Sequence, residues 1–386
     1  MAELADYYRE IYIRGLGGEK PIVPVAAAEL EALARERMDE RAVNYVWAGA
    51  GAEGTIRANR EAFERHRIVA RMLRDVSSRD LSTTVLGTAM PAPLLLCPIG
   101  VQEIVHPDGE LATARAAAAV GVPMIASTAA HHPLEEIAAA GGPDAPRWFQ
   151  LYWGSDKALV KSFLERAEAA GYEAIVLTVD CFVPGWKPRD LQQAWLPFLE
   201  GVGVGNYFQD PVFRAALAQT PEEDQGAATG HMLGLQANPA LTWDDLAWLR
   251  EQTPLPIVVK GIQHADDARE AVRRGVDGIV VSNHGGRQVD GAIGSLDALP
   301  AIADAVGGEL AVLFDSGVRS GADVLKALAL GADAVCLGRP YIWGLALEGQ
   351  AGVEAVLKMI LAELDLTMAL CGLTKPSEIT PDLLAD

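Results

Sequence analysis

The sequence has little positive charge and no long apolar run. Its 386 residues include 32 basic and 52 acidic side chains, which gives a formal net charge of −20. A field of that sign repels phosphate backbones and anionic membrane surfaces, so it argues against nucleic acid or a membrane as a partner. No stretch of about 18 consecutive apolar residues occurs, so the sequence predicts no segment that spans a bilayer.

Cysteine is also scarce. The four cysteines, Cys97, Cys181, Cys336 and Cys371, lie far apart and form no C-x-x-C pair. This usage is typical of reduced thiols, and we expect a cytoplasmic protein. The first residues, MAELADYYREIYIRG, are charged and lack the apolar stretch of a signal peptide, so we expect no leader.

Metal-binding patterns are absent from the sequence. No H-x-x-H or H-E-x-x-H spacing occurs, and we predict no catalytic metal. Six of the seven histidines have no context that indicates chemistry; they are His66, His106, His131, His132, His231 and His264.

What the sequence does contain is enough apolar material for a large core. Hydrophobic residues make up 50% and charged residues 22%, close to the average for globular proteins. The length fits either two or three domains or one α/β barrel with insertions.

Eight short apolar runs, each followed by an amphipathic segment, favour the barrel. This alternation is typical of βα units around a parallel sheet, and eight strands close a (β/α)8 TIM barrel. The runs are residues 94–97, 123–127, 148–152, 174–180, 257–260, 278–282, 311–315 and 334–338.

We therefore expect a single barrel domain over residues 1–386. Residues 1–90 form an N-terminal extension, with helices over 26–45 and 54–65. Residues 181–240, after the fourth strand, form an insertion too long for one helix, which is a lid, a binding loop or a disordered segment. Residues 349–386 contain a last helix, over 349–370.

Catalytic side chains of barrel enzymes lie at the C-terminal ends of the strands. The seventh and eighth strands run into DSGVRSG and GRP, which contain Arg319 and Arg339. Gly-rich loops at this place commonly bind phosphate through backbone N–H groups, and arginines add charged hydrogen bonds. The alternative is that the glycines turn the chain and the arginines face solvent.

Lys260 ends the fifth strand among apolar neighbours, where an unpaired charge is costly. Three roles are open for this side chain: a Schiff-base nucleophile, a fixed cation beside a bound cofactor, or one partner of a structural salt bridge.

The segment SNHGGRQVD follows the sixth strand and contains His284 and Arg287. Histidine serves as a base near neutral pH, and arginine holds a carboxylate with two hydrogen bonds. Asp180, at the end of the fourth strand, is available to orient the imidazole. His284 is therefore the leading candidate for a general base.

At SNHGGRQVDG, with VKG before it and DSGVRSGADVLKALALGADAVCLGRP after it, the sequence resembles the FMN-dependent L-2-hydroxy-acid oxidases and dehydrogenases. The resemblance covers nearly the whole chain. The stretches EIYIRGL, GWKPRDL, NYFQDPVF, KGIQHADDAR and RPYIWG look most like its lactate 2-monooxygenase branch.

The resemblance implies FMN as the cofactor and O2 as the electron acceptor, and with the two Gly-rich loops and Lys260 we expect this FMN to be bound non-covalently. His284 would take a proton from the 2-hydroxy acid, with Asp180 stabilising the imidazolium. Arg287, Tyr45 and Tyr152 would contact the substrate, and Lys260 would stabilise the reduced ring. The positions implied to contact FMN are Ile99, Gly100, Ser127, Gln150, Thr178, Lys260, Ser282, Asp315, Gly317, Arg319, Gly338 and Arg339.

In the monooxygenase branch the 2-keto acid reacts with peroxide to give a decarboxylated acid, CO2 and water. In an oxidase the 2-keto acid and H2O2 leave separately. The family also commonly forms tetramers or larger homo-oligomers.

One position departs from the family pattern. Seven residues after Asp180 the family has a second carboxylate-binding arginine, and this sequence has Lys187. Lysine supplies charge without a planar fork, so we expect the substrate carboxylate to be held differently. The alternative to lactate is therefore a bulkier substrate or another 2-hydroxy acid. Ala129, in the side-chain pocket of relatives, would leave room for such a group.

Two rival hypotheses follow from the residues alone. A class I aldolase-type barrel would explain Lys260 and the phosphate loops but not His284, Arg287 and Asp180. A non-catalytic barrel that assembles through its acidic surface would explain none of these groups.

Overall fold

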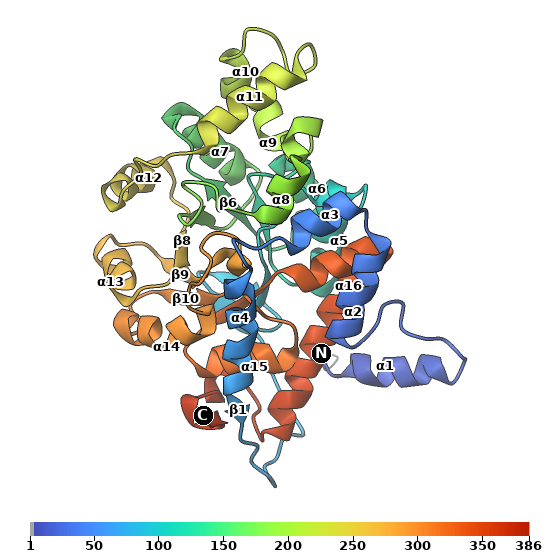
Figure 1. The fold of residues 1–386 in the computed structure, drawn as a ribbon. Coiled ribbons are helices and arrows are strands. Elements are labelled where there is room, and N and C mark those ends of the chain that lie inside the picture. The colour runs from blue at the N-terminus through green and yellow to red at the C-terminus, as the bar shows by residue number, and fades with distance from the viewer. Residues whose placement is uncertain (1–3, 386) are drawn as a thin grey trace.

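The computed structural model describes residues 4–385. At its centre, eight parallel strands close into a barrel in the order of the chain, and the last strand pairs with the first (Figure 1). The strands are β4 (Leu94–Leu96), β5 (Met124–Ser127), β6 (Arg147–Tyr152), β7 (Ile175–Thr178), β8 (Ile257–Ile262), β9 (Gly278–Val281), β10 (Ala311–Phe314) and β11 (Ala334–Leu337). Each predicted run overlaps one of these strands, and the (β/α)8 fold is confirmed.

The barrel interior is a packed core. Alternate strand residues such as Trp148, Val176 and Val258 point inward, as the period of two requires. A hairpin that the sequence analysis missed, β2 (Thr83–Val85) with β3 (Thr88–Met90), packs at the N-terminal ends of the strands. There the Trp148 indole N–H donates to the Thr88 hydroxyl at 2.8 Å. The hairpin thus covers the end opposite the polar strand ends.

A helix lies outside the barrel after each strand. These helices are α5 (Gly109–Val120), α6 (Leu134–Gly141), α7 (Lys157–Ala169), α12 (Leu246–Gln252), α13 (Ala265–Arg273), α14 (Ser295–Val306), α15 (Gly321–Ala329) and α16 (Arg339–Leu370). Helix α16 has a kink at Glu348 and Gly349, where the sequence analysis began the last helix. The helical segment after this kink, which runs to Leu370, matches the predicted last helix, and the segment before the kink is the helix that follows β11.

The N-terminal extension covers one side of the barrel. It contains α1 (Asp6–Gly15), α2 (Ala27–Arg37), α3 (Glu40–Trp47), α4 (Gly54–Arg65) and the short strand β1 (Arg67–Ile68), which pairs with β12 (Leu384–Ala385). The single helix predicted over 26–45 is wrong. Met38 is extended, and the Asp39 carboxylate caps α3 by accepting from the Arg41 N–H at 2.8 Å.

The insertion after β7 is folded, so the disordered alternative is wrong. It contains α8 (Pro188–Gln193), α9 (Gly205–Phe208), α10 (Pro211–Ala215) and α11 (Gln225–Gln236), at the top of Figure 1. The Asn206 amide, on α9, donates to the backbone carbonyls of Ser127 and Thr128, both at 3.1 Å. These bonds fasten the insertion to the C-terminal end of β5.

In the described part of the chain, every helix is too short or too polar to cross a membrane.

Candidate functional site

A cavity of about 520 Å³ lies at the C-terminal ends of the barrel strands. Its wall comes from strand ends, from α3 and from the insertion. Most of the predicted site residues line it: Tyr45, Ile99, Gly100, Ser127, Ala129, Tyr152, Lys187, Lys260, His284, Arg287, Asp315, Gly317, Arg319, Gly338 and Arg339. The structure thus brings together residues from positions 45 to 339.

The other four predicted residues lie just behind this wall. Ser282 accepts a hydrogen bond from Lys260 at 2.7 Å, and Asp180 accepts one from His284. Gln150 accepts one from the Ser127 hydroxyl at 3.0 Å, and Thr178 pairs with Lys260 across β7 and β8.

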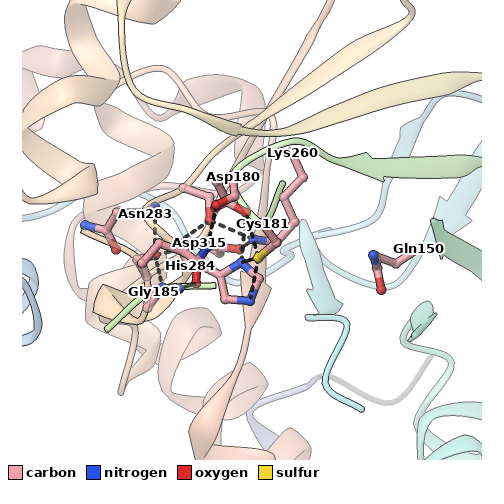
Figure 2. A network of polar contacts seen from close by, with 12 residues as sticks. Gln150, Asp180, Cys181, Gly185, Lys260, Asn283, His284 and Asp315 are labelled. Atoms are coloured by element: carbon pink, nitrogen blue, oxygen red, sulfur yellow. Dashed lines mark hydrogen bonds and ion pairs between the residues drawn. The ribbon is translucent and has the colours of Figure 1, made fainter. Parts of the chain in front are cut away.

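His284 and Asp180 form the closest candidate catalytic pair (Figure 2). His284 Nδ1 lies 2.9 Å from Asp180 Oδ1. His284 has a φ of +56°, a conformation that costs energy for a residue with a side chain. It is held there by the short turn η4 (His284–Gly286), with the Asn283 side chain accepting from the Gly286 N–H at 3.0 Å. This backbone geometry directs the imidazole into the cavity.

The charges around this pair favour an ionised carboxylate. Burial alone would raise the pKa of Asp180, but the neighbouring His284 and Lys260 more than offset burial and lower it. With Nδ1–H donating to that carboxylate, Nε2 of the neutral ring is left as the proton acceptor.

Lys260 is held as a cation. Its Nζ lies 3.0 Å from Asp315 Oδ2 and donates to Ser282 Oγ at 2.7 Å. Burial alone would lower the pKa of Lys260, but Asp315 and Asp180 raise it above its ordinary value. A Schiff-base nucleophile needs a neutral amine, so this environment opposes that hypothesis.

Two arginines converge on the C-terminus of α3. Arg287 donates to the carbonyls of Tyr45 and Ala48 at 2.7 and 2.9 Å, and its guanidinium lies 5.1 Å from the Tyr45 ring centroid. Arg339 donates to the carbonyls of Val46, Ala48 and Gly285 at 3.0 to 3.2 Å. The carbonyls and the negative helix end hold these cations in the cavity wall without neutralising them.

Among the described residues, Arg339 has no carboxylate within ion-pair distance, and Arg319 has only one long contact with a carboxylate. The nearest oxygen of Glu31 lies 3.9 Å from Arg319 Nε. Burial lowers the pKa of Arg319 to about 10 and that of Arg339 to about 9. Two buried guanidiniums with little counter-charge are a site for an anion such as a phosphate.

The FMN expected from the sequence fits these residues. Gln150 Nε2 and Thr178 Oγ1 are buried and have no hydrogen-bond partner within residues 4–385. They pair in the sheet with Ser127 and Lys260, which line the cavity. Because buried polar atoms are nearly always bonded, both indicate a polar ligand at the floor of the cavity. Lys260 suits a ring that carries negative charge, and the buried guanidiniums of Arg319 and Arg339 suit a phosphate.

Lys187 and Arg287 provide the positive charge of the cavity mouth. Burial lowers the pKa of Lys187, and Arg287 lowers it further. Within the described chain, the Lys187 Nζ donates one hydrogen bond, a long one of 3.4 Å to the Gly185 carbonyl. Arg189, by contrast, makes two hydrogen bonds to Glu53 at 2.6 and 2.9 Å. The cation available to a substrate is therefore Lys187.

Tyr45 and Tyr152 keep their hydroxyl protons. Burial raises the pKa of both phenols, that of Tyr152 well above its ordinary value. Both side chains line the cavity and can therefore donate hydrogen bonds to a ligand.

Sequence reasoning missed two residues of this site. Asp190 lines the cavity, and neither of its carboxylate oxygens has a hydrogen-bond partner in the described chain. Burial raises the pKa of Asp190. Cys181 Sγ lies 3.3 Å from His284 Nδ1, and burial raises the pKa of this thiol well above its ordinary value. The sequence position of Cys181, next to Asp180, was the signal that could have identified it.

The chain is similar to known proteins over most of its length. Residues 34–386 match the family model of the FMN-dependent dehydrogenases. The chain is 46% identical to an L-lactate oxidase of Lysinibacillus sphaericus, over 95% of this chain and 93% of that protein. It is 43% identical to 2-hydroxyacid oxidase 1 of Homo sapiens, over 89% and 92% of the two chains. A crystal structure of mandelate oxidase matches with a TM-score of 0.83 and 39% identity, over 94% of this chain and 98% of the other.

Proposed function

The chain belongs to the FMN-dependent dehydrogenase family, and from that premise we propose that it oxidises an L-2-hydroxy acid with O2 as the electron acceptor. That it is an FMN-dependent 2-hydroxy-acid oxidoreductase follows from the family and from relatives named lactate oxidase and hydroxyacid oxidase. The proposal concerns the residue roles, the acceptor and the products. The observation that carries it is the His284–Asp180 pair, which faces a cavity whose wall contains two buried arginines with little counter-charge.

When bound at this site, FMN would supply the acceptor for the two electrons that the 2-hydroxy acid loses. We assign to His284 Nε2 the removal of a substrate proton, because Nδ1 is committed to Asp180. The Asp180 carboxylate holds the tautomer that makes Nε2 basic and then stabilises the imidazolium.

The substrate carboxylate is assigned to Arg287 and Lys187. Both line the cavity, and neither has a carboxylate within ion-pair distance in the described chain. Tyr45 and Tyr152 would donate hydrogen bonds to substrate oxygens. Ala129 has a small side chain in the wall, which leaves space for a substituent larger than a methyl group.

We assign cofactor binding to residues in the same cavity wall and just behind it. Arg319 and Arg339 would hold the phosphate, with the backbone of Gly317 and Gly338 beside them. Lys260 would stabilise negative charge on the ring. The remaining contacts are assigned to Ile99, Gly100, Ser127, Gln150, Thr178, Ser282 and Asp315.

For the products we propose the lactate 2-monooxygenase outcome, in which a 2-keto acid and peroxide react before release to give the decarboxylated acid, CO2 and water. Its support is the folded insertion, which contributes Leu196, Phe198 and Leu233 to the cavity wall. Release of 2-keto acid and H2O2 is the second candidate, and it is favoured by relatives named as oxidases.

Product analysis distinguishes the two outcomes. The purified FMN-loaded protein would be supplied with a panel of 2-hydroxy acids in air, and acid, 2-keto acid and H2O2 would be quantified. The proposal predicts decarboxylated acid with little free peroxide on the best substrate. One H2O2 for each substrate consumed would contradict it and establish a simple oxidase.

We also propose a homo-oligomer, a tetramer or larger, in the cytoplasm. Helix α1 extends away from the body in Figure 1; it exposes Tyr12 and Ile13, and its C-cap residue Leu16 is also exposed, which suits a contact with a second copy. The four cysteines are free thiols, as in a reducing compartment.

A further inference from the structure

Three different metal-ligating side chains meet at the catalytic pair. Cys181 Sγ lies 3.3 Å from His284 Nδ1 and 3.4 Å from Asp180 Oδ1, and the latter two atoms are 2.9 Å apart. In Figure 2 the sulfur lies beside the imidazole ring, and the Asp180 carboxylate lies above both. The three atoms form a compact triangle.

The size and chemistry of this triangle match a zinc site. With Zn–S of about 2.3 Å and Zn–N and Zn–O of about 2.0–2.2 Å, the ligand atoms of a tetrahedral site are roughly 3.3–3.6 Å apart. The observed edges need a shift of only a few tenths of an ångström. Thiolate, imidazole and carboxylate are the three ligand types that zinc prefers.

The site also has room for a metal and for its fourth ligand. Asp180 Oδ2 is buried and has no hydrogen-bond partner within residues 4–385, so a second carboxylate oxygen is available. Cys181 and His284 line the cavity, which leaves one side open to water. The nearby cation, Lys260, is already paired with Asp315 at 3.0 Å.

We propose that Asp180, Cys181 and His284 form an inhibitory site for a thiophilic divalent cation such as Zn²⁺. The cation binds the Cys181 thiolate, and the thiol proton passes to solvent. Carboxylate and imidazole alone would bind it weakly, so Cys181 is the residue that creates the site. A hard cation such as Mg²⁺, which prefers oxygen ligands, does not compete.

The cation blocks turnover through the histidine tautomer. A metal on Nδ1 takes the lone pair there, and the ring proton moves to Nε2. Nε2 then donates a hydrogen bond and no longer accepts a proton. The metal also removes the hydrogen bond through which Asp180 orients the ring. This cation inhibits the reaction, so the proposal does not conflict with the prediction that the protein has no catalytic metal.

The test measures zinc on the FMN-loaded protein. Equilibrium dialysis gives the affinity and stoichiometry, and X-ray absorption at the zinc edge identifies the ligands. We expect one Zn²⁺ per chain, with one sulfur and two or more nitrogen or oxygen ligands. Zinc should inhibit turnover at the concentrations at which it binds, and Mg²⁺ should not.

Two cysteine variants give the matched comparison. Cys181→Ser should bind Zn²⁺ at least ~10-fold more weakly, the lower end for loss of a residue that supports a metal site. Cys371→Ser, at the C-terminal cap of α16 and outside the cavity wall, should bind like the unmodified chain. If Cys181→Ser fails to fold, Cys181→Thr replaces it.

The dialysis and absorption measurements report only whether zinc binds and whether sulfur is one of its ligands. Their outcome is therefore independent of the substrate and products proposed above. Zinc bound without sulfur, equal affinity in Cys181→Ser and Cys371→Ser, or no bound zinc would each overturn the inference.

Discussion

Single buried charges determine what the cavity binds. Lys260 is paired with Asp315 and donates a hydrogen bond to Ser282. Arg319 and Arg339 instead donate to carbonyl oxygens, which leaves their charges available to a bound anion. The sequence located these three cations because each follows an apolar strand. It could not show Asp190 as a wall residue, because this side chain comes from the insertion rather than from a strand end, whereas the position of Cys181 next to Asp180 was a usable signal. Their roles depend on tertiary placement.

Arg339→Gln is expected to weaken FMN binding by about 1.5–3 kcal/mol, the range for a hydrogen bond to a charged group. The guanidinium is buried and lacks a carboxylate, so its loss leaves a phosphate unpaired. The dissociation constant would be measured by flavin fluorescence, with Arg41→Gln, an exposed arginine, as the control. Equal affinity in both variants would remove Arg339 from the phosphate site.

Lys187→Arg is expected to raise kcat/KM for small acids such as lactate by about 1 kcal/mol, the lower range for one charged hydrogen bond. Arginine supplies the fork that lysine lacks. Lys157→Arg, on an exposed side chain, is the control. A value no higher than that of the unmodified chain would place the substrate carboxylate elsewhere.

At the scale of elements, the barrel strands were predictable and the insertion was not. Runs such as IVVK and GIVV carry their own periodic signal, and each became a strand. Helices α9 and α10 have only four and five residues, too few for a periodic pattern. Their positions depend on long-range bonds such as that of Asn206 with Ser127, which no local pattern encodes. The single helix predicted over 26–45 is interrupted at Met38 and Asp39, because the Asp39 carboxylate caps the start of α3 and this local preference outweighs the apolar periodicity.

Glu53→Gln is expected to loosen the insertion and to shift the products toward 2-keto acid and peroxide. Glu53 receives both hydrogen bonds of Arg189, which follows Lys187 at the start of α8. Without the paired charge, α8 has a weaker tie to the N-terminal extension. Peroxide would be measured per substrate consumed, with Glu222→Gln, on the exposed Arg214 pair, as the control. An unchanged ratio in Glu53→Gln would mean that this contact does not retain the products.

Acid should loosen the same contact. The hydrogen bonds from Arg189 lower the pKa of Glu53 below its ordinary value of 4.5. The contribution of this pair is therefore complete above about pH 4.5 and is lost as the pH falls through the lower, folded-state value. Hydrogen exchange of residues 188–193 should rise in that window relative to Glu53→Gln at the same pH. Parallel profiles in the two proteins would contradict the assignment.

At the scale of the whole molecule, α1 and its C-terminal cap form one of the exposed apolar surfaces of the described chain. Tyr12 is 64%, Ile13 67% and Leu16 90% exposed. The sequence shows a charged N-terminus, but it does not predict that α1 extends away from the barrel, because that depends on what α2 and α16 already cover.

The double variant Tyr12→Ser with Ile13→Ser is expected to form smaller assemblies than the unmodified chain, because a contact between copies would lose apolar area. Light scattering after size exclusion would give the mass, with Leu370→Ser, exposed at the end of α16, as the control. A monomeric unmodified chain, or equal masses for all three proteins, would contradict the proposed assembly.

The central claim is that His284, oriented by Asp180, is the base that starts the oxidation. Anaerobic stopped-flow mixing with the best 2-hydroxy acid measures flavin reduction directly. We expect His284→Ala to retain FMN and to reduce it ~10²-fold or more slowly, the usual scale for loss of a general base. His264→Ala, on an exposed histidine, should react like the unmodified chain. Reduction of His284→Ala at the unmodified rate would contradict the account.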